Sequence, residues 1–283
     1  MLMKNIIIGT AGWRMKYGNS LSILSTREIT ALINHLKSYK IFSYDTATSY
    51  GDVEEILFSK LEKNTQIDTK LKSFDDINEF KKNLKDKLKF PIRTLYFHDP
   101  KIFKRFPSKE VQTFVKTIND EGFNAGFSIY DKEDILDNLQ FFEMEENKVQ
   151  LPVHLFDLTV LNKVLMAKIK AENVNLRSFF ARGLLFLSTE KFKKALGEEY
   201  YKIKNGFEEL YKMPLTPKNA QNLTYSLINY LTSNNFSCII GLNSIREVNF
   251  FIKQSNAAKN QNINWKKIIA SSNKLIDIQE INL

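Results

Sequence analysis

The stretch Asp45-Thr46-Ala47-Thr48-Ser49-Tyr50-Gly51 joins an apolar segment to a helical one. Before it, Ile41-Phe42-Ser43-Tyr44 has the composition of a buried strand. After it, Asp52-Val53-Glu54-Glu55-Ile56-Leu57 begins with an acidic first turn, which predicts a helix. Asp45 therefore stands at the carboxyl end of a strand and Tyr50 in the loop that follows. Taken alone, the pattern is equally consistent with Asp45 capping the helix and Tyr50 packing the loop.

The alternation of an apolar strand with a helix recurs along the whole chain. The predicted strands are residues 4–12, 42–47, 66–71, 93–97, 123–130, 149–156, 175–180 and 237–242. The predicted helices are residues 26–36, 53–61, 76–88, 108–121, 132–139, 160–171, 219–231, 245–252 and 265–276, and the polar stretch 191–211 is predicted as an excursion plus a helix. Such alternation predicts a parallel sheet with right-handed crossovers. Eight units in 283 residues predict a (β/α)8 TIM barrel, and we expect one domain over residues 1–283 because no Pro/Gly/Ser-rich linker interrupts them.

An open doubly wound sheet is the main alternative fold. It normally carries a glycine-rich phosphate loop of the form G-x-G-x-x-G after its first strand. Here the corresponding segment reads Gly9-Thr10-Ala11-Gly12-Trp13, which has two glycines without that spacing. The sequence therefore favours the closed barrel.

Composition narrows the class of protein. The hydrophobic content of 43% is normal for a soluble globular protein, and no run approaches the roughly 18 apolar residues of a membrane span. The single cysteine, Cys238, lies in a strand-like run and fits a core position in a reducing compartment. Met1-Leu2-Met3-Lys4-Asn5 passes straight into the first strand, which leaves no room for a signal peptide. We expect a cytoplasmic protein without a membrane partner.

The net charge of +9 is spread along the predicted helices, as in Lys81-Lys82-Asn83-Leu84-Lys85-Asp86-Lys87. That pattern is typical of solvated helix faces. A nucleic-acid partner would require a basic stripe on a recognisable module, and the sequence contains none. The phosphates of a small cofactor would be a sufficient anionic partner.

If the barrel closes, four candidate side chains of different types come together at one end of it. Asp45, Lys70 and His98 end the second, third and fourth predicted strands, and Tyr50 follows the second. The carboxyl ends of all barrel strands share one mouth. A phenol has a pKa of about 10, and a nearby ammonium lowers it, which makes proton donation easier. A carboxylate would orient the ammonium, and an imidazole could hydrogen-bond a substrate oxygen. The set suits protonation of a carbonyl oxygen while hydride arrives from a cofactor.

Each of these residues has a structural interpretation when taken alone. Lys70 could be a surface lysine at a strand end, and His98 could cap a turn before Asp99-Pro100. Four such placements at successive strand ends are improbable as coincidences. The joint placement is what carries the functional hypothesis.

These residues and their spacing resemble the aldo-keto reductase family, and the resemblance covers most of the chain. The matching stretches are Gly9-Thr10, Asp45-Thr46-Ala47 with Tyr50-Gly51 and Glu54, Thr69-Lys70-Leu71, Leu95 to His98, the strand of Gln150, and Ile240-Gly241. The resemblance implies an NADP(H)-dependent carbonyl reductase with a barrel fold and no metal. It makes Tyr50 the general acid, supported by Lys70, Asp45 and His98.

The resemblance also implies a cofactor site. The cofactor-binding candidates are Gly9, Thr10, Ser128, Gln150, Arg177, Ser178, Gly241, Asn243, Ser244 and Arg246. The sequence departs from the family pattern where Ile129 follows Ser128 and where Arg177 replaces an aromatic residue. The last strand is followed by Asn243-Ser244-Ile245-Arg246 in place of a Lys-Ser segment, so the choice between NADP(H) and NAD(H) stays open.

The expected substrate is a small carbonyl compound or a sugar derivative, with Trp13 and His154 as candidate substrate contacts. Trp13 could equally be a core aromatic, and His154 a packed neutral histidine. Two other functions remain open. One is a nucleotide-binding barrel with a regulatory or subunit role and little turnover, which the altered cofactor contacts allow. The other is an aldolase or isomerase that uses Lys70 as a Schiff-base nucleophile, which a neighbouring Asp45 disfavours. The sequence predicts no particular oligomeric state.

Overall fold

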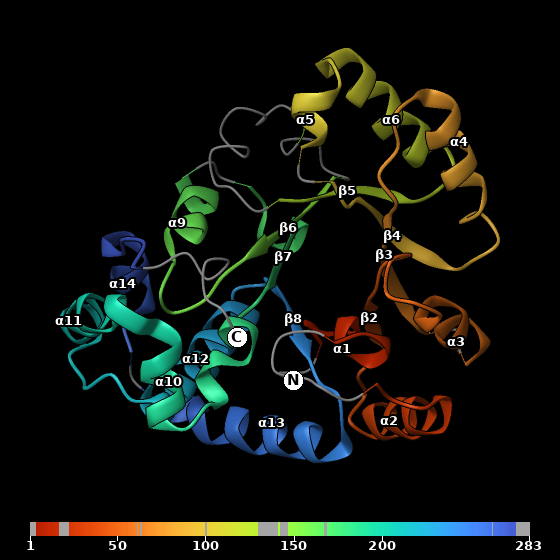
Figure 1. Ribbon diagram of the computed structural model, residues 1–283. Helices are drawn as coiled ribbons and strands as arrows, with labels where there is room; N and C mark the ends of the chain where they lie inside the picture. Colours follow the sequence, from red (N-terminus) through yellow and green to blue (C-terminus); the bar gives the residue numbers. More distant parts are fainter. Residues whose placement is uncertain are drawn as a thin grey trace.

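The strands of the protein close into a barrel. The computed structural model describes residues 4–16, 23–60, 62, 64–99, 101–129, 141, 147–166, 169–261 and 263–275. All neighbouring strands pair in parallel, in the order β1 to β8, and β8 pairs with β1 to complete the ring. Figure 1 looks into this ring, and the sequence colours run round it in order. The predicted (β/α)8 TIM barrel is confirmed.

All eight predicted strands are present. They are β1 Ile6–Gly9, β2 Ser43–Asp45, β3 Gln66–Leu71, β4 Ile92–Phe97, β5 Asn124–Ser128, β6 Lys148–Pro152, β7 Val174–Arg177 and β8 Ser237–Gly241. Several predicted strands extended too far at the carboxyl end, because the apolar run continues into the loop. Residues Ala11–Arg14, for example, form a short helix where the first strand was predicted to continue.

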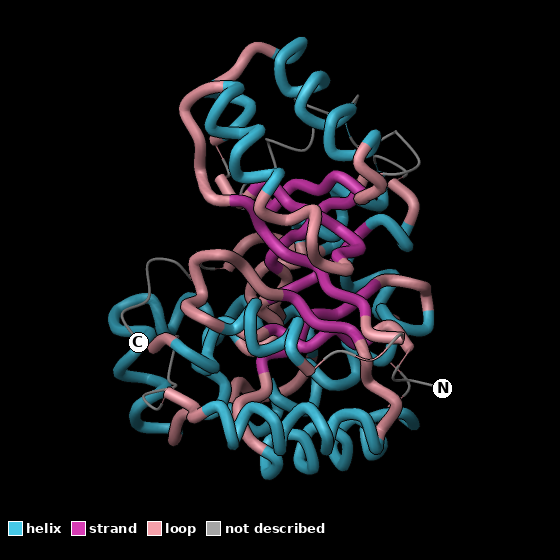
Figure 2. The backbone as a smooth tube through the Cα atoms, turned by 90° about the vertical axis from the view of Figure 1, so that its right-hand side faces the viewer, coloured by secondary structure: helices cyan, strands magenta, loops and turns pink. Residues whose placement is uncertain are grey.

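Helices surround the ring, as the side view in Figure 2 shows. They are α1 Ala11–Arg14, α2 Thr26–Ser38, α3 Val53–Ser59, α4 Ile77–Lys85, α5 Ile102–Arg105, α6 Ser108–Asp120, α9 Thr159–Met166, α10 Thr189–Leu196, α11 Tyr200–Tyr211, α12 Pro217–Ser233, α13 Ile245–Ala257 and α14 Trp265–Ser271. Four short 3-10 helices are η1 Ala171–Asn173, η2 Ala181–Phe186, η3 Gly197–Glu199 and η4 Ala258–Asn260. The predicted helix 132–139 lies outside the described residues, and the stretch 191–211, predicted as an excursion plus a helix, contains most of α10, then η3 and α11.

Side-chain caps fix several helix starts. Ser25 and Glu28 form a capping box at α2, and Asp76 accepts hydrogen bonds from the backbone at the start of α4. Thr216 caps α12, whose first residue is Pro217. These local signals are present in the sequence and explain why the helices begin where the strand-to-helix loops end.

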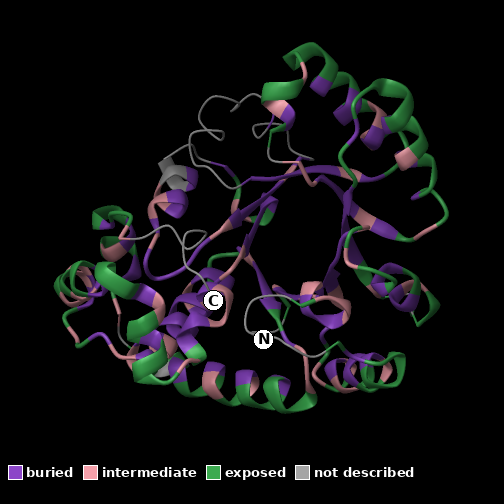
Figure 3. Cartoon of the chain, viewed as in Figure 1, coloured by how far each residue is buried: buried purple, intermediate pink, exposed green. Residues whose placement is uncertain are grey.

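The hydrophobic core fills the space between strands and helices. Figure 3 shows buried residues along the strands and the inner helix faces, with exposed residues on the outer faces. Phe80 of α4 and Phe114 of α6 contact Phe97 of β4, and Phe74 contacts all three rings. The ring contacts among these residues make the packing of α4 and α6 against the barrel specific.

The interior of the barrel is polar, unlike this outer core. Gln150 on β6 bonds Asp45 on β2, and Asn175 on β7 bonds both Asp68 on β3 and Tyr96 on β4. These strands are not neighbours in the ring, so their side chains meet across its inside. Gly126 on β5 makes room for the Tyr96 ring, because a Cβ there would lie 2.5 Å from a Tyr96 ring carbon. The polar interior carries the candidate site.

A buried ion pair joins α3 to the segment after α4. Lys87 Nζ lies 2.6 Å from Glu54 Oε2, and the side chains are 7% and 10% exposed. The other carboxylate oxygen of Glu54 accepts a hydrogen bond from the hydroxyl of Thr69 on β3. The pair therefore ties two helices to the strand that carries Lys70.

We expect Lys87→Met to destabilise the fold, because it leaves the Glu54 carboxylate buried without its cation. Removing one partner of a buried pair costs about 3–5 kcal/mol, whereas an exposed pair contributes about 0–1 kcal/mol. The free energy of unfolding in urea should fall accordingly. The double variant Glu54→Gln/Lys87→Met should lose less than Lys87→Met alone. Lys202→Met, which removes an exposed pair with Glu199, is the matched control. Equal losses for the two lysine variants would contradict this role for the pair.

Candidate active site

The four predicted catalytic residues stand at the carboxyl end of the barrel. Asp45 is the last residue of β2, Lys70 lies at the end of β3, and His98 directly follows β4. Tyr50 lies in the loop between β2 and α3. The residue after it, Gly51, has a φ of +74°, a conformation that a glycine adopts without strain.

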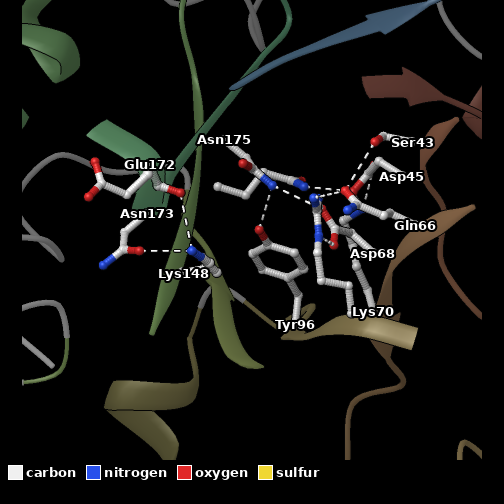
Figure 4. A network of polar contacts seen from close by, with 12 residues as sticks. Ser43, Asp45, Gln66, Asp68, Lys70, Tyr96, Lys148, Glu172, Asn173 and Asn175 are labelled. Carbon is white, nitrogen blue, oxygen red and sulfur yellow. Dashed lines mark hydrogen bonds and ion pairs between the residues drawn. The ribbon is translucent and has the colours of Figure 1, made fainter. Parts of the chain in front are cut away.

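A buried ion pair forms the centre of this site. Lys70 Nζ lies 2.7 Å from both carboxylate oxygens of Asp45 and donates a third hydrogen bond to the carbonyl of Thr46, at 3.1 Å. Gln150 Nε2 donates to Asp45 Oδ1 at 2.7 Å. Figure 4 shows the ammonium between the Asp45 carboxylate and the remaining polar side chains of the interior. The lysine head is thus held by three oxygens in one position.

The pair favours the charged lysine. Burial opposes the ammonium, but the attraction of Asp45 and Tyr50 outweighs it and raises the pKa of Lys70 above its ordinary value. Burial raises the pKa of Asp45, and Lys70 and Gln150 act in the opposite direction. Because Lys70 stays protonated through the physiological range, the carboxylate keeps its counter-charge.

The structure brings Tyr50 and His98 to this pair. The Lys70 ammonium lies 5.5 Å from the centre of the Tyr50 ring. The rings of Tyr50 and His98 meet edge to face, with centres 6.2 Å apart and planes at 87°. Both residues are half-buried. The structure therefore brings the four side chains together at the carboxyl end of the barrel.

His98 is held in its neutral form. Burial is the main cause, and the positive charges of Lys70 and Arg177 add to it, so the pKa of His98 falls to about 4. Asp99 opposes the shift, but its carboxylate pairs with Arg105. A neutral imidazole can donate one hydrogen bond and accept another.

Two buried polar side chains stand beside the ion pair. Ser128 on β5 and Gln150 on β6 lie opposite each other in the strand register, and they are 2% and 0% exposed. Within the part of the chain that the structure describes, Ser128 Oγ and Gln150 Oε1 have no hydrogen-bond partner. Buried polar groups are normally satisfied. One hydroxyl and one amide oxygen left open side by side fit the NH2 and C=O of a carboxamide such as that of nicotinamide.

Gly9 and Thr10 end β1 on the other side of Asp45. The Thr10 hydroxyl donates to the Asp45 carbonyl at 3.0 Å, and its backbone N–H bonds the same oxygen. Gly9 pairs in register with Asp45 and with Gly241. Thr10 thus helps to position Asp45 in this structure.

The loop after β7 has an unusual backbone. Ser178, Ala181 and Arg182 have φ values of +69°, +54° and +55° without being glycines. Such residues cost of order 1–3 kcal/mol each and cluster at functional sites. Arg177 Nη2 donates to the Ile129 carbonyl at 3.3 Å, and Arg177 Nη1 lies 3.4 Å from Ser178 Oγ. The guanidinium thereby bridges the ends of β5 and β7 at the mouth.

The segment after β8 caps its own helix. Ser244 Oγ accepts a hydrogen bond from Glu247 N at 3.1 Å, and Glu247 Oε2 accepts one from Asn243 N at 2.7 Å. The Asn243 side chain packs against Gly12 in α1. Gly241 and Arg246 are exposed. A carboxylate therefore occupies part of the helix start at which a phosphate was expected.

The two candidate substrate contacts differ in position. Trp13 is fully buried, its ring meets Tyr44, and its indole N–H donates to the Leu242 carbonyl at 2.9 Å. It is the core aromatic of the alternative interpretation and does not line an opening in this structure. His154 is also buried, in a two-residue bridge to Asp157 and 6.1 Å from the Phe156 ring. That environment matches a packed histidine.

Sequence reasoning missed the polar groups below the ion pair. Asp68, two residues before Lys70, is fully buried and accepts hydrogen bonds from Arg93 and Asn175. The signal was present in β3, where Gln66, Asp68 and Lys70 alternate with Ile67, Thr69 and Leu71. In a strand that alternation places all three on one face.

A small recess opens on the outer side of His98. Its empty volume is about 190 Å³, and its lining is Lys72, Ser73, Phe74, Phe97, His98, Asp99, Ile102, Arg105 and Phe106. Much of that volume is open solvent, and the enclosed space is far too small for a drug-sized ligand. The sequence did not predict these residues as part of the site.

Two kinds of feature, a membrane-spanning helix and a metal-binding cluster, are absent from the described residues. These residues contain no helix long and apolar enough to cross a membrane. They contain no group of three or more His, Cys, Asp or Glu side chains placed to hold a metal ion.

Comparison with known proteins gives a match in structure alone. No family model and no curated sequence matches the chain. A Pseudomonas aeruginosa protein provisionally assigned as an aldo-keto reductase aligns over 90% of both chains, with 15% identity and a TM-score of 0.64. A second such Pseudomonas aeruginosa structure covers 90% of this chain and 89% of its own, with 17% identity and a TM-score of 0.59. An aldo-keto reductase from a Medee basin deep-sea metagenome library covers 97% and 93%, with 16% identity and a TM-score of 0.57. The resemblance is confirmed at the level of the fold: the chain has the barrel fold of aldo-keto reductases.

Proposed function

We propose that the protein is an NAD(P)H-dependent reductase of a small carbonyl compound, an aldehyde, ketone or sugar derivative. The observation that carries the proposal is the buried Asp45–Lys70 pair with its ammonium 5.5 Å from the centre of the Tyr50 ring. A fixed positive charge beside a phenol, at the carboxyl end of a barrel, is suited to proton transfer.

The cofactor half of the proposal rests on Ser128 and Gln150. Their open buried oxygens would hold a carboxamide, and Gln150 is bonded at the same time to Asp45. A nicotinamide held there would lie beside the ion pair. When bound, the reduced cofactor supplies hydride to the carbonyl carbon. The strained loop at Ser178 to Arg182 and the start of α13 are the candidates for its phosphates.

Tyr50 would complete the reaction by protonating the carbonyl oxygen. Hydride addition turns the carbonyl into an alkoxide, and the phenolic proton converts the alkoxide into the alcohol. The phenolate left behind is stabilised by Lys70, whose charge Asp45 maintains. Solvent then returns the proton to Tyr50. Neutral His98, edge to face with Tyr50, would donate a hydrogen bond to the same oxygen and orient the substrate.

A Schiff-base function for Lys70 is disfavoured by its surroundings. A lysine nucleophile must lose its proton, which requires a depressed pKa. Asp45 and Tyr50 instead raise the pKa of Lys70. The ammonium also donates hydrogen bonds to three oxygens and has no lone pair with which to attack a carbonyl carbon.

Replacement of Tyr50 tests the proton transfer. We expect Tyr50→Phe to lower kcat for carbonyl reduction by roughly 10²- to 10⁴-fold, the usual contribution of a general acid. NADPH and NADH oxidation with a panel of aldehydes and ketones measures it. Tyr201→Phe, at a side chain that is 73% exposed, is the control and should retain the original rate. An unchanged rate in Tyr50→Phe would remove Tyr50 from the mechanism.

The protonation of His98 can be followed directly. The chain has three histidines, so ¹⁵N-histidine NMR gives a simple spectrum. We expect His98, assigned by its loss in His98→Gln, to titrate near pH 4 and not near its ordinary value of 6.5. Because the unfolded chain takes up this proton first, His98 lowers stability as the pH falls from 6.5 towards 4 and has no such effect above that window. A midpoint near 6.5 would contradict a neutral, desolvated imidazole.

Cofactor fragments can test the carboxamide site. Ser128→Ala should weaken NADPH or NADH binding by roughly 2- to 12-fold, equivalent to one neutral hydrogen bond of about 0.5–1.5 kcal/mol. ADP-ribose, which lacks the nicotinamide, should bind Ser128→Ala and the original protein equally. Titration calorimetry measures both ligands. Equal losses for the two would show that the substitution acts through the fold, and no loss for either would remove Ser128 from the site.

A further inference from the structure

A third ion pair with a buried carboxylate, besides Asp45–Lys70 and Glu54–Lys87, lies below the Asp45–Lys70 pair, towards the amino ends of the strands. Arg93 donates to both carboxylate oxygens of Asp68, through Nε at 2.9 Å and Nη2 at 2.6 Å. Asp68 is 0% exposed, whereas the Arg93 side chain is 32% exposed. We call Asp45–Lys70 the upper ion pair and Asp68–Arg93 the lower ion pair.

A break in the register of β4 aims Arg93 at Asp68. Ile67 pairs with Ile92, but the next residue, Asp68, pairs with Thr94, so Arg93 is an extra residue in the ladder. Such a β-bulge changes which face of the strand a side chain takes, and bulges are over-represented next to active sites. Ile92 packs in the outer core, while Arg93 reaches the interior. Counted back from Thr94, which pairs with inward-facing Asp68, a regular strand would turn Arg93 outward, whereas the extra residue lets Arg93 reach Asp68.

The two carboxylates of the ion pairs are neighbours. Asp45 on β2 and Asp68 on β3 are partners in the strand register, and both point into the barrel. Like charges at such a position repel, and the Asp68 charge works with burial to raise the pKa of Asp45. The Arg93 guanidinium is the charge that balances Asp68.

We propose that Arg93 is a positioning residue for the active site: by neutralising Asp68 it keeps Asp45 ionised, and Asp45 in turn holds the Lys70 ammonium beside Tyr50. Arg93 acts through two carboxylates and does not touch the reacting atoms. The mechanistic consequence rests on the proposed reductase function, whereas the effect on Asp45 does not.

Several other groups around Asp45 also influence whether its carboxyl is ionised. Lys70 on β3 is its cation, Gln150 on β6 is a neutral donor, and Tyr50 lies in its own loop. Tyr96 on β4 stays neutral, because burial and the charges of Asp68 and Asp45 raise its pKa well above the ordinary value. Arg177 on β7 acts on Lys70. Asp68 is thus the other carboxylate among the described groups that act on Asp45.

Asn175 makes the lower ion pair rigid. Its Nδ2 donates to Asp68 Oδ2 at 3.1 Å and to the Tyr96 hydroxyl at 2.8 Å, so it links three strands. Figure 4 shows Asp68 and Asn175 close to Asp45 and Lys70, with Asn175 linked to Asp68 and Tyr96. The Asp68 carboxylate therefore has little freedom to turn away from Asp45 when its cation is removed.

Removing the positive or the negative charge of the lower ion pair should shift the titration midpoint of Asp45 in opposite directions. Arg93→Gln leaves Asp68 uncompensated, and we expect the Asp45 carboxyl to titrate about one pH unit higher. Asp68→Asn removes the repulsion, and Asp45 should titrate lower. The double variant Asp68→Asn/Arg93→Gln should lie closest to the original protein. Carbon-detected NMR of ¹³C-labelled aspartate, with Asp45 assigned through Asp45→Asn, measures the midpoints without turnover.

The acid limb of kcat/KM against pH should follow the same order: higher for Arg93→Gln, lower for Asp68→Asn, and restored in the double variant. Lys148→Gln is the matched control for a neighbouring cation that makes no hydrogen bond to Asp68. Its amine bonds Asn173 and the Glu172 carbonyl, and Asp68 acts on it only through charge, so this variant should shift Asp45 less than Arg93→Gln does. An equal shift in Lys148→Gln, or a shift of the same sign in both single variants, overturns the proposal. If Arg93→Gln does not fold, an unmoved midpoint in Asp68→Asn overturns it as well. NMR shifts in a protein without carbonyl turnover would uphold the role of Arg93 and refute the reductase function.

Discussion

The site depends on a lysine and an aspartate held together inside a closed ring of strands. Taking two charges out of water costs several kcal/mol per ion, and mutual attraction offsets this only with good geometry and further hydrogen bonds. Asp45 and Lys70 meet that condition because both carboxylate oxygens face the ammonium, and Thr46 and Gln150 supply the remaining partners. A barrel provides these partners because its opposite walls lie within reach of one side chain. The fold therefore makes the buried pair possible.

Charge is arranged in layers along the barrel axis. Arg93 lies nearer the amino end, Asp68 and Asp45 follow as register neighbours, and Lys70 faces Tyr50 at the carboxyl end. Each carboxylate has its own cation, so the interior is balanced despite its many ionised groups. A regular β4 would place Arg93 outside, and the bulge at that residue corrects the balance. A local irregularity in one strand is thus part of the electrostatics at the mouth.

The fold and the centre of the site were predictable from the sequence for a physical reason. Strands with apolar runs and capped helices are local patterns, and a closed barrel brings strand ends together whatever the loops do. That predicted Asp45, Lys70 and His98 at the carboxyl ends of β2, β3 and β4, where the structure has them. Contacts across the interior were not predictable, because they depend on register and on side-chain directions that no local pattern records. The buried position of Trp13 and the unpaired amide oxygen of Gln150 are features of this kind, which local sequence patterns do not record.

The positive charge of Lys70 also limits the protonation of His98. An imidazole beside a permanent ammonium and the Arg177 guanidinium pays an electrostatic penalty for a second proton, and burial increases the penalty. A neutral His98 can still donate a hydrogen bond through its N–H. In the proposed reaction this leaves proton transfer to Tyr50 and the orientation of the substrate oxygen to His98.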